Sequence, residues 1–390
     1  MLNQLDEPPG SHPRDTRLRW SESNFVPGNL LTLHVNTAFP NRYLAIEGHK
    51  LYPFTTDIKP LFEIYQRRSQ VPLSDYSFAN NIIWLSQKSG FYQIIEDCFC
   101  LFCLTGDGLT MPLPPLGAPE HQYAALQACF EIMDGYNATP YLGKVEFVYR
   151  DFLQVMPLNL EVAPGVLPAA TQAEPFAGAL PCAAQDTVFP AVSDGVWLVE
   201  RSLPDYIYST SDLIELKGNA YKTKRSEINQ FRRIHPDHHM ETLGPQHWDG
   251  IRELVNTWLQ NRLKYLPPAD IANFLCTAEL ERTAINRALE HYDHLQLDGL
   301  CLFIGDRLEG FTFAERITPD VASVLVEKTN FMIPGAAQYL FRELAKTYTD
   351  CTYINVGDDL GLENLRKVKM SYRPALFGEK FTFSRHCAPR

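Results

Sequence analysis

The chain has 390 residues, 45% of them hydrophobic and 21% charged, and a formal net charge of −11 at pH 7. This length predicts two or three domains, and the composition is typical of a globular rather than a disordered protein. A chain this acidic has no overall attraction for nucleic acid or anionic lipid, so either contact requires a local basic patch. No apolar run is long enough to span a bilayer, and residues 1–19 contain no apolar signal segment. We therefore expect a cytoplasmic protein without a transmembrane segment.

The cysteines and histidines do not predict a metal site. Cys98 and Cys100 lie two residues apart in an apolar run, so on a strand they share a face, and Cys103 points the other way. Reduced core cysteines are the expectation. The histidines at 235, 238 and 239 fall in a predicted turn, and no second ligand group stands at zinc spacing.

The first half of the chain alternates helical and strand patterns after a loosely structured start over 1–42. The predicted elements are helices over 55–70 and 77–88, a hairpin of 91–104 with 108–113, a helix over 121–134, a strand pair within 144–155 and a strand over 196–199. Residues 157–190 are rich in Pro and Ala with little charge or periodicity, which predicts a flexible loop or linker insert.

The second half repeats this order. The predicted elements after residue 240 are helices over 248–264 and 277–292, a hairpin of 300–304 with 308–317, a strand over 321–327, a helix over 335–348, a strand over 351–356, a helix over 362–372 and a strand over 377–384. This order is similar to that of GCN5-related N-acetyltransferases. We therefore predict an α+β fold of two tandem acetyltransferase-like domains, 43–200 and 201–390, each a mixed sheet flanked by helices.

Residues 206–233 contain the one strongly basic run of the sequence. A first short helix, capped by Ser211, is predicted to end at Gly218, and a second to cover about 220–233. The second carries five cations with aromatic residues between them: Lys222, Lys224, Arg225, Arg232 and Arg233. The run is either a solvated helix face or an anion site for a phosphate, a diphosphate or a nucleic-acid backbone. We favour the anion site because the run is local and opposes the net charge.

A second informative stretch covers residues 351–374. A strand-like run stops at Gly357, Asp358 and Asp359 follow, and a helix begins after Leu360-Gly361. The acids precede the helix N-terminus and basic residues lie toward its C-terminal half, as the helix dipole favours. A strand that opens into a polar helix start is a common place for an acyl-transfer fold to hold its substrates.

Together these stretches resemble the DUF2156 family. The resembling residues are Leu213-x-x-Leu216-Lys217-Gly218-Asn219-x-Tyr221-x-x-Lys224-Arg225-x-x-Ile228-Asn229-x-Phe231 and Asn355-x-Gly357-x-Asp359-Leu360-Gly361-x-x-x-Leu365-Arg366-Lys367-x-Lys369-x-Ser371-Tyr372-x-Pro374. The family groups with the C-terminal catalytic domain of phosphatidylglycerol lysyltransferases, and the resemblance runs from about 55 to 383 around the insert.

The resemblance implies a tandem acetyltransferase-like fold, related also to FemX-type peptidyltransferases. Characterised lipid transferases of this family move an aminoacyl group from aminoacyl-tRNA to a lipid hydroxyl and carry a large membrane domain in front. This sequence shows no such domain, so the lipid acceptor is only one of the expected acceptors.

Acyl-CoA is the alternative donor. Related acetyltransferases hold its diphosphate on backbone N–H groups in a loop that resembles Gln/Arg-x-x-Gly-x-Gly/Ala. Here Gly335 and Ala337 fit the last positions, but Met332 replaces the polar residue and Pro334 removes a donor. Residues 116–119 of the first half fit no better. The sequence therefore argues modestly against CoA, and it predicts no other cofactor.

Acyl transfer needs a base for the nucleophile, donors for the oxyanion and an acid for the leaving group. Glu327, at a predicted strand end, is the candidate base, and Tyr372 is the candidate proton donor. Asp359 is the third catalytic candidate, and with Asp358 it is expected to bind a substrate amine or a cationic aminoacyl side chain. The alternatives are a surface strand end for Glu327, buried packing for Tyr372 and helix capping for the two aspartates.

The remaining candidates are predicted to bind substrate. They are Lys217, Tyr221, Lys222, Lys224, Arg225, Asn229, Asn330, Asn355, Asp358, Arg366, Lys367 and Lys369. The expected activity is transfer of an aminoacyl group from aminoacyl-tRNA to a small amine, hydroxyl, lipid or peptide acceptor. An acyl-CoA-dependent N-acyltransferase and a non-catalytic anion-binding module are the alternatives.

Overall fold

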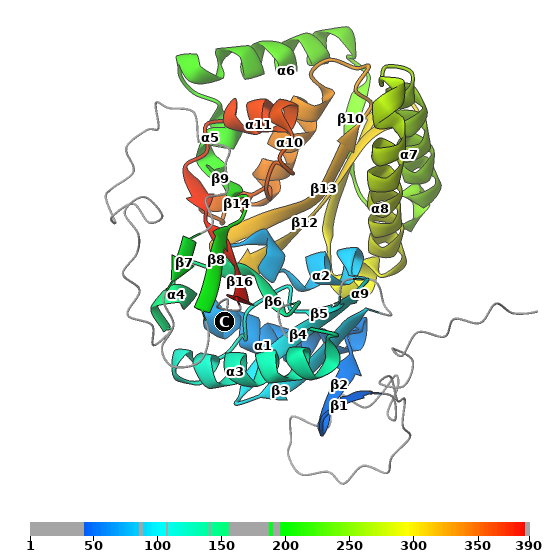
Figure 1. Ribbon diagram of the computed structural model, residues 1–390. Coiled ribbons are helices and arrows are strands. Elements are labelled where there is room, and N and C mark those ends of the chain that lie inside the picture. The colour runs from blue at the N-terminus through cyan, green and yellow to red at the C-terminus, as the bar shows by residue number, and fades with distance from the viewer. Residues whose placement is uncertain are drawn as a thin grey trace, which may run out of the picture.

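The computed structural model describes residues 43–85, 89–106, 108–139, 142–155, 187–189 and 196–386. Three sheets and the helices around them make up the fold (Figure 1). The predicted loose segment 1–42 and nearly all of the predicted insert at 157–190 lie outside these residues.

The first sheet is an antiparallel meander from the first half of the chain. Its strands in order are β1 (Leu44–Ile46), β2 (His49–Pro53), β3 (Gly90–Ile95), β4 (Cys98–Thr105) and β5 (Gly108–Thr110). The prediction of one strand over 91–104 was wrong, because Glu96 and Asp97 take positive φ angles of 49° and 53° and turn the chain there. Cys98 and Cys100 are buried in the core, and Cys103 is half-buried.

The second sheet has seven strands and carries most of the second half. In order they are β10 (His238–Thr242), β11 (Asp298–Ile304), β12 (Arg307–Thr318), β13 (Val321–Thr329), β14 (Tyr353–Asn355), β9 (Asp205–Ser209) and β15 (Leu376–Gly378). β13 and β14 are parallel, as expected for strands joined through a helix, and the other neighbours are antiparallel.

Helices cover both faces of this sheet (Figure 1). On one side lie α5 (Thr210–Glu215), α6 (Lys222–Ile234), α10 (Ala336–Thr347) and α11 (Glu363–Met370). On the other lie α7 (Trp248–Leu263) and α8 (Ile271–Glu290), followed by α9 (Tyr292–Leu295). The predicted cap of the first short helix was wrong: Ser209, not Ser211, accepts the backbone N–H of Asp212 and caps α5.

The third sheet joins distant parts of the chain. Its order is β6 (Lys144–Tyr149), β16 (Lys380–His386), β8 (Val196–Arg201) and β7 (Thr187–Phe189), so the last strand lies between strands of the first half. The predicted single strand over 377–384 is therefore two strands, β15 and β16, in different sheets. The predicted second strand within 144–155 was also wrong, because the chain turns at Arg150 and forms α4 (Phe152–Val155).

The helices of the first half share a core with the second half. α1 (Lys59–Ser69) and α2 (Phe78–Trp84) place Phe62 and Phe78 in one buried cluster with Ile285 of α8 and Phe311 of β12. α3 (Pro119–Tyr136) packs over a second core between the first and third sheets. The predicted domain boundary near residue 200 stays a prediction, but β16 and this shared core both cross it. Short 3-10 helices complete the described fold: Thr56–Ile58, Ser74–Tyr76, Asn219–Tyr221, Pro245–His247 and Pro268–Asp270.

The loop before α10 is held closely against α6. Gly335 has a φ of +86°, and a Cβ there would lie closer than 3.0 Å to the backbone carbonyl oxygen of Glu227. Gly48, in the turn between β1 and β2, has a similar φ of +88° but open space around its Cα. The two glycines therefore share backbone strain but differ in packing.

We predict that Gly335→Ala lowers the free energy of unfolding by about 2–4 kcal/mol, because strain and overpacking add. Gly48→Ala should cost only about 1 kcal/mol, because it adds strain alone. Denaturant titration of both variants checks this. Equal losses of unfolding free energy in the two variants would show that α6 does not restrict the space at Gly335.

Candidate active site

The centre of the site is the opening between β13 and β14. These strands pair only from Val321 to Ser323, opposite Tyr353 to Asn355. Beyond that, β13 continues to Thr329 against β12, whereas the chain after β14 turns at Gly357, where φ is +67°, toward α11. The backbone edge of β13 past Ser323 therefore faces a gap that no neighbouring strand fills.

Glu327 lies on the open part of β13. Its Oε2 atom is buried and has no hydrogen-bond partner among the described residues. Burial raises the pKa of this carboxyl to about 8, although the nearby Lys369 opposes the shift. A buried carboxyl group that titrates near neutral pH and lacks a partner is typical of a catalytic base.

Lys369 of α11 places a cation beside Glu327. Its Nζ atom donates to the carbonyl oxygens of Val356 (2.6 Å), Gly357 (3.2 Å) and Asp358. Burial lowers the pKa of this ammonium to about 8, and the charge of Asp358 opposes that shift. The lysine thus carries its charge close to Glu327 while its hydrogen bonds go to the loop after β14.

Tyr372 closes the same region after α11. Its ring packs edge-on against Phe341, with ring centroids 5.2 Å apart, and only 8% of the residue is exposed. Burial raises the pKa of its hydroxyl, and the charges of Glu327 and Glu227 add to the shift. The structure therefore brings the predicted base and the predicted proton donor together, and the hydroxyl stays protonated at neutral pH.

Glu227 of α6 is a site residue that the sequence analysis missed. Its Oε2 atom is buried without a hydrogen-bond partner among the described residues, and Lys224 Nζ lies 3.8 Å from it. Lys224 is also buried and stands 4.4 Å from the centre of the Tyr372 ring. Glu227 stands one turn beyond Lys224 on the face that also holds Ile228 and Phe231, a spacing that could have identified it.

Asp359, predicted to be catalytic, is anchored by its neighbours. Its carboxylate accepts hydrogen bonds from Tyr206 Oη at 2.7 Å, Arg366 Nε at 2.7 Å and the backbone N–H of Gly361 at 2.9 Å. Burial alone would raise its pKa, but the hydrogen bonds from Arg366 and Tyr206 outweigh it and hold the pKa below its usual value. This geometry favours an anchoring role for Asp359 and Arg366, and no free acceptor for substrate follows from it.

Other predicted binding residues of the basic run also have structural partners. The Arg225 guanidinium donates to the carbonyl oxygens of Leu216 and Gly218 (2.7 Å), which follow α5. Tyr221 donates its hydroxyl proton to the Tyr372 carbonyl at 3.2 Å. Lys217 pairs with Glu215 at the surface, 2.7 Å away. These residues shape the site rather than open it.

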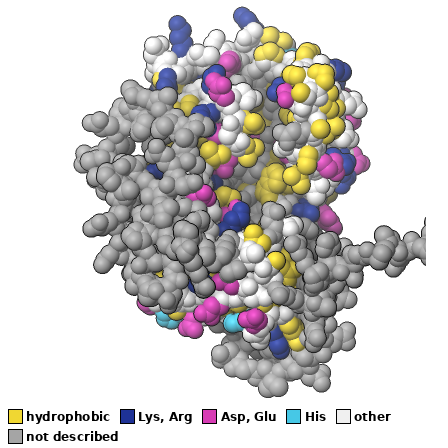
Figure 2. Space-filling view, viewed as in Figure 1, with side chains coloured by type: hydrophobic (Ala, Val, Ile, Leu, Met, Phe, Trp, Pro, Cys, Tyr) yellow, Lys and Arg dark blue, Asp and Glu magenta, His cyan; other side chains and the backbone are white. Residues whose placement is uncertain are grey.

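The outer face of α6 is basic and exposed. Lys222 and Asn229 are exposed there, as are Arg232 and Arg233 at its end. Figure 2 shows Lys and Arg side chains projecting along the top edge of the molecule, where α6 lies. On α11, Lys367 is also exposed and pairs with Glu363 at 2.6 Å.

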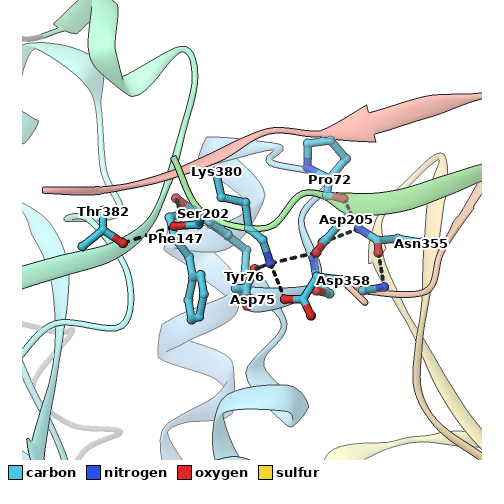
Figure 3. A network of polar contacts seen from close by, with 12 residues as sticks. Pro72, Asp75, Tyr76, Phe147, Ser202, Asp205, Asn355, Asp358, Lys380 and Thr382 are labelled. Atoms are coloured by element: carbon cyan, nitrogen blue, oxygen red, sulfur yellow. Dashed lines mark hydrogen bonds and ion pairs between the residues drawn. The ribbon is translucent and has the colours of Figure 1, made fainter. Parts of the chain in front are cut away.

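Three more predicted residues stand in polar networks. Asn330 donates to Glu309 Oε2 at 2.8 Å and accepts the backbone N–H of Met332. Asn355 and Asp358 belong to a network around Lys380, a buried lysine that the sequence analysis missed (Figure 3). The sequence pattern that could have identified Lys380 is its position directly before the alternating Phe381 and Phe383 of a predicted strand.

Comparison with known proteins shows the family to which this chain belongs. The family model for the C-terminal domain of phosphatidylglycerol lysyltransferase matches residues 176–383, more than half of the chain. The chain belongs to this phosphatidylglycerol lysyltransferase C-terminal family. The resemblance found in the sequence is confirmed, and membership of the family supports a transferase. No curated protein matches the chain.

Solved structures show the same fold. A conserved protein of unknown function from Bacteroides thetaiotaomicron is 23% identical, with a TM-score of 0.68 over 88% of this chain and all of its own. The DUF2156 domain of a putative lysylphosphatidylglycerol synthetase from Agrobacterium fabrum is 11% identical, with a TM-score of 0.55 over 83% of this chain and 90% of its own.

The structure of L-PGS from Bacillus licheniformis is 12% identical, with a TM-score of 0.54 over 87% of this chain and 94% of its own. The predicted α+β fold, of acetyltransferase-like units with sheets flanked by helices, is confirmed. Among the described residues, no helix has the length and apolarity needed to cross a membrane.

We predict that Asp359→Asn lowers the free energy of unfolding of the protein by about 2 kcal/mol at pH 7, because it weakens the hydrogen bonds to Arg366 and Tyr206. The pKa of Asp359 is depressed, so the stability that its ionised form contributes is present at neutral pH and is lost as the pH falls through the acid range. Thermal unfolding at several pH values should therefore show the largest difference from wild type near pH 7. A difference that grows in acid would contradict the anchoring role.

Proposed function

We propose that this chain transfers an aminoacyl group from aminoacyl-tRNA to an amine, hydroxyl, lipid or peptide acceptor, with Glu327 as the base. The observation that supports this most is the buried, unpartnered Oε2 atom of Glu327 at the opening between β13 and β14. An acceptor that enters this gap meets a carboxylate oxygen that has no competing hydrogen bond among the described residues.

The neighbouring groups support each step of such a transfer. The ionised Glu327 takes a proton from the attacking amine or hydroxyl, which forms a bond to the ester carbonyl of the donor. The ester bond to the tRNA ribose then breaks, and the departing oxygen takes a proton from the Tyr372 hydroxyl, which burial keeps protonated. Returning the proton from Glu327 to Tyr372 restores both groups. The Lys369 charge favours the ionised base and the developing oxyanion.

Two carboxylate oxygens without hydrogen bonds among the described residues also suit an aminoacyl substrate. Glu327 and Glu227 both raise the pKa of Tyr372, so both carboxyl groups lie near its ring, and each has a buried oxygen without a hydrogen-bond partner among the described residues. A primary ammonium group provides three donors and a charge that such oxygens accept. We infer that the amino group of the transferred residue binds beside Glu227.

Helix α6 supports aminoacyl-tRNA as the donor. Its exposed basic face offers Lys222, Arg232 and Arg233 to a phosphate backbone. Its inner face packs against the loop before α10, where a Cβ on Gly335 would clash with the Glu227 carbonyl. Related acetyltransferases hold the CoA diphosphate at this loop, and here α6 packs closely against it.

We predict that Glu327→Gln lowers the rate of label transfer from a pool of charged tRNAs by about 10²–10⁴-fold, because the amide cannot accept the proton. The wild-type rate should rise with pH toward a plateau above about pH 8, where Glu327 is ionised. Glu290→Gln, an exposed change at the end of α8, is the matched control and should leave the rate unchanged. Full activity of Glu327→Gln would rule out this base.

We also predict that Lys222→Ala combined with Arg232→Ala and Arg233→Ala weakens tRNA binding and lowers the slope of log affinity against log salt. The slope should fall by roughly one unit for each lost phosphate contact. Binding titrations at several salt concentrations measure it. Alanine at Arg262 of α7 and at Lys264, which directly follows that helix, is the control on the opposite side of the sheet. An unchanged slope would show that tRNA does not use α6.

An acyl-CoA-dependent transferase is the second candidate, favoured only by the fit of Gly335 and Ala337 at the start of α10. Ligands that bind the folded state raise the melting temperature by mass action. Stabilisation by acyl-CoA but not by charged tRNA would replace the aminoacyl donor with an acyl donor. A fully active Glu327→Gln protein that still binds tRNA would favour a non-catalytic binding module.

A further inference from the structure

A buried ionic network joins the halves of the chain at the loop after β14 (Figure 3). Lys380 of β16 is 1% exposed, and its Nζ atom lies 2.7 Å from Asp75, 2.8 Å from Asp205 and 3.5 Å from Asp358. Asp75 lies in the short helix Ser74–Tyr76 of the first half, and Asp205 begins β9. Asp358 lies in the loop after β14. One lysine therefore ties three separate parts of the chain together.

Asn355, the last residue of β14, connects this network to the catalytic loop. Its Nδ2 atom donates to Asp205 and to the carbonyl oxygen of Pro72, each at 2.8 Å. Its Oδ1 atom accepts the backbone N–H of Gly357 at 2.8 Å. Side-chain bonds from a fully buried asparagine thus fix the direction in which the chain leaves β14.

The same loop holds the active-site lysine. The carbonyl oxygens of Val356, Gly357 and Asp358 accept the Lys369 hydrogen bonds, and this ammonium is the cation near Glu327. The contacts therefore run without a break from Pro72 and Lys380, through Asn355 and the loop, to the group that sets the charge around the base.

Among its described residues, the first half has no comparable opening of its own. Met111, directly after β5, makes a parallel bridge to Val145 of β6, the counterpart of the β13–β14 pairing. The chain then returns to β4, because Leu116 pairs with Phe99. The buried Gln122 of α3 donates to the Pro115 carbonyl oxygen at 3.2 Å and fills the space behind it. In the part of the chain that the structure describes, the first half supplies an anchor to the site rather than a second opening.

We propose that Asn355 and Lys380 are positioning residues for the transfer reaction, which hold the loop 355–359 so that the Lys369 ammonium stays beside Glu327. The catalytic meaning of this role rests on the proposed function. The positioning itself is a statement about the fold and can be tested without activity.

The charged and titratable groups that act on Glu327 are few among the described residues. They are Lys369 of α11 and Tyr372 after it, and Tyr372 in turn lies near Lys224 and Glu227 of α6. Lys369 alone is held by the loop carbonyls. If the loop loosens, this ammonium moves away and the carboxyl of Glu327 becomes harder to ionise.

The test compares wild type with Glu327→Gln in urea from pH 5 to pH 10. The folded Glu327 has a raised pKa, so between its unfolded value and about 8 the wild type loses stability as the pH rises. Glu327→Gln has no such carboxyl and does not lose this stability. The difference in unfolding free energy between the two proteins therefore grows with pH and levels off near the pKa of folded Glu327. The pair is then repeated with Asn355→Leu, and with Ser202→Ala as the matched control.

Ser202 suits this control because its hydroxyl forms a hydrogen bond with Thr382 of β16 at 3.1 Å and, among the described residues, forms none with the loop (Figure 3). The pH at which this difference levels off is the levelling point. We expect it to rise by about one pH unit with Asn355→Leu, which is a tenfold change in the proton affinity of Glu327, and to stay unchanged with Ser202→Ala. In the activity assay, Asn355→Leu should lower kcat more than it changes KM.

An unmoved levelling point in Asn355→Leu overturns the proposal. If that variant does not fold, Asp75→Asn decides, because the amide keeps the shape of the side chain and weakens only the ion pair with Lys380. A shift in the same direction supports the proposal, and no shift overturns it. Because unfolding is the readout, a failure here is distinguishable from a failure of the proposed function, which would appear as full activity of Glu327→Gln.

Discussion

The short parallel pairing of β13 with β14 is the constraint on which the site depends. A buried backbone carbonyl oxygen that has no hydrogen bond to a neighbouring strand needs another donor. Here the carbonyl oxygens of the loop after β14 are satisfied by a side chain, the Lys369 ammonium. The charge beside Glu327 is thus a consequence of ending the sheet early, because the lysine that replaces the missing strand must come from a neighbouring helix.

The same opening explains why the site weakens the fold locally. A carboxyl group buried without a hydrogen-bond partner opposes folding whenever it is ionised. The surroundings compensate elsewhere: Asp359 is held by hydrogen bonds, and α1, α2 and α8 share a large cluster of buried hydrophobic side chains. Such a division between a strained site and a well-satisfied frame is typical of enzymes, in which stability and activity compete for the same positions.

Much of this arrangement could be predicted from local sequence. Gly357, the two acids after it and the basic helix that follows mark a strand that opens into a helix start, and the structure has one there. Glu327 and Tyr372 were chosen from their positions in elements, and the fold brings them together. Local patterns succeed where the controlling interactions lie within a few residues, as in turns, caps and amphipathic helices.

Contacts between distant segments could not be predicted in this way. Arg225 was assigned to substrate because a basic run suggests an anion site, but its nearest acceptors are the carbonyl oxygens that follow α5. The role of Lys380 depends on Asp75 and Asp205, which are far from it in the sequence. The turn at Glu96-Asp97 lacks the glycine or asparagine that usually marks left-handed backbone. The sequence pattern therefore predicted one strand where the structure has β3 and β4.

The position of β16 has a consequence for how the protein is made. Because this strand separates β6 from β8, neither can complete its hydrogen bonds until the ribosome has released residues 380–386. The first half therefore waits during translation with strand edges that another chain could pair with. The acidic surface of the nascent protein, which repels its copies, is then a protection against aggregation during synthesis.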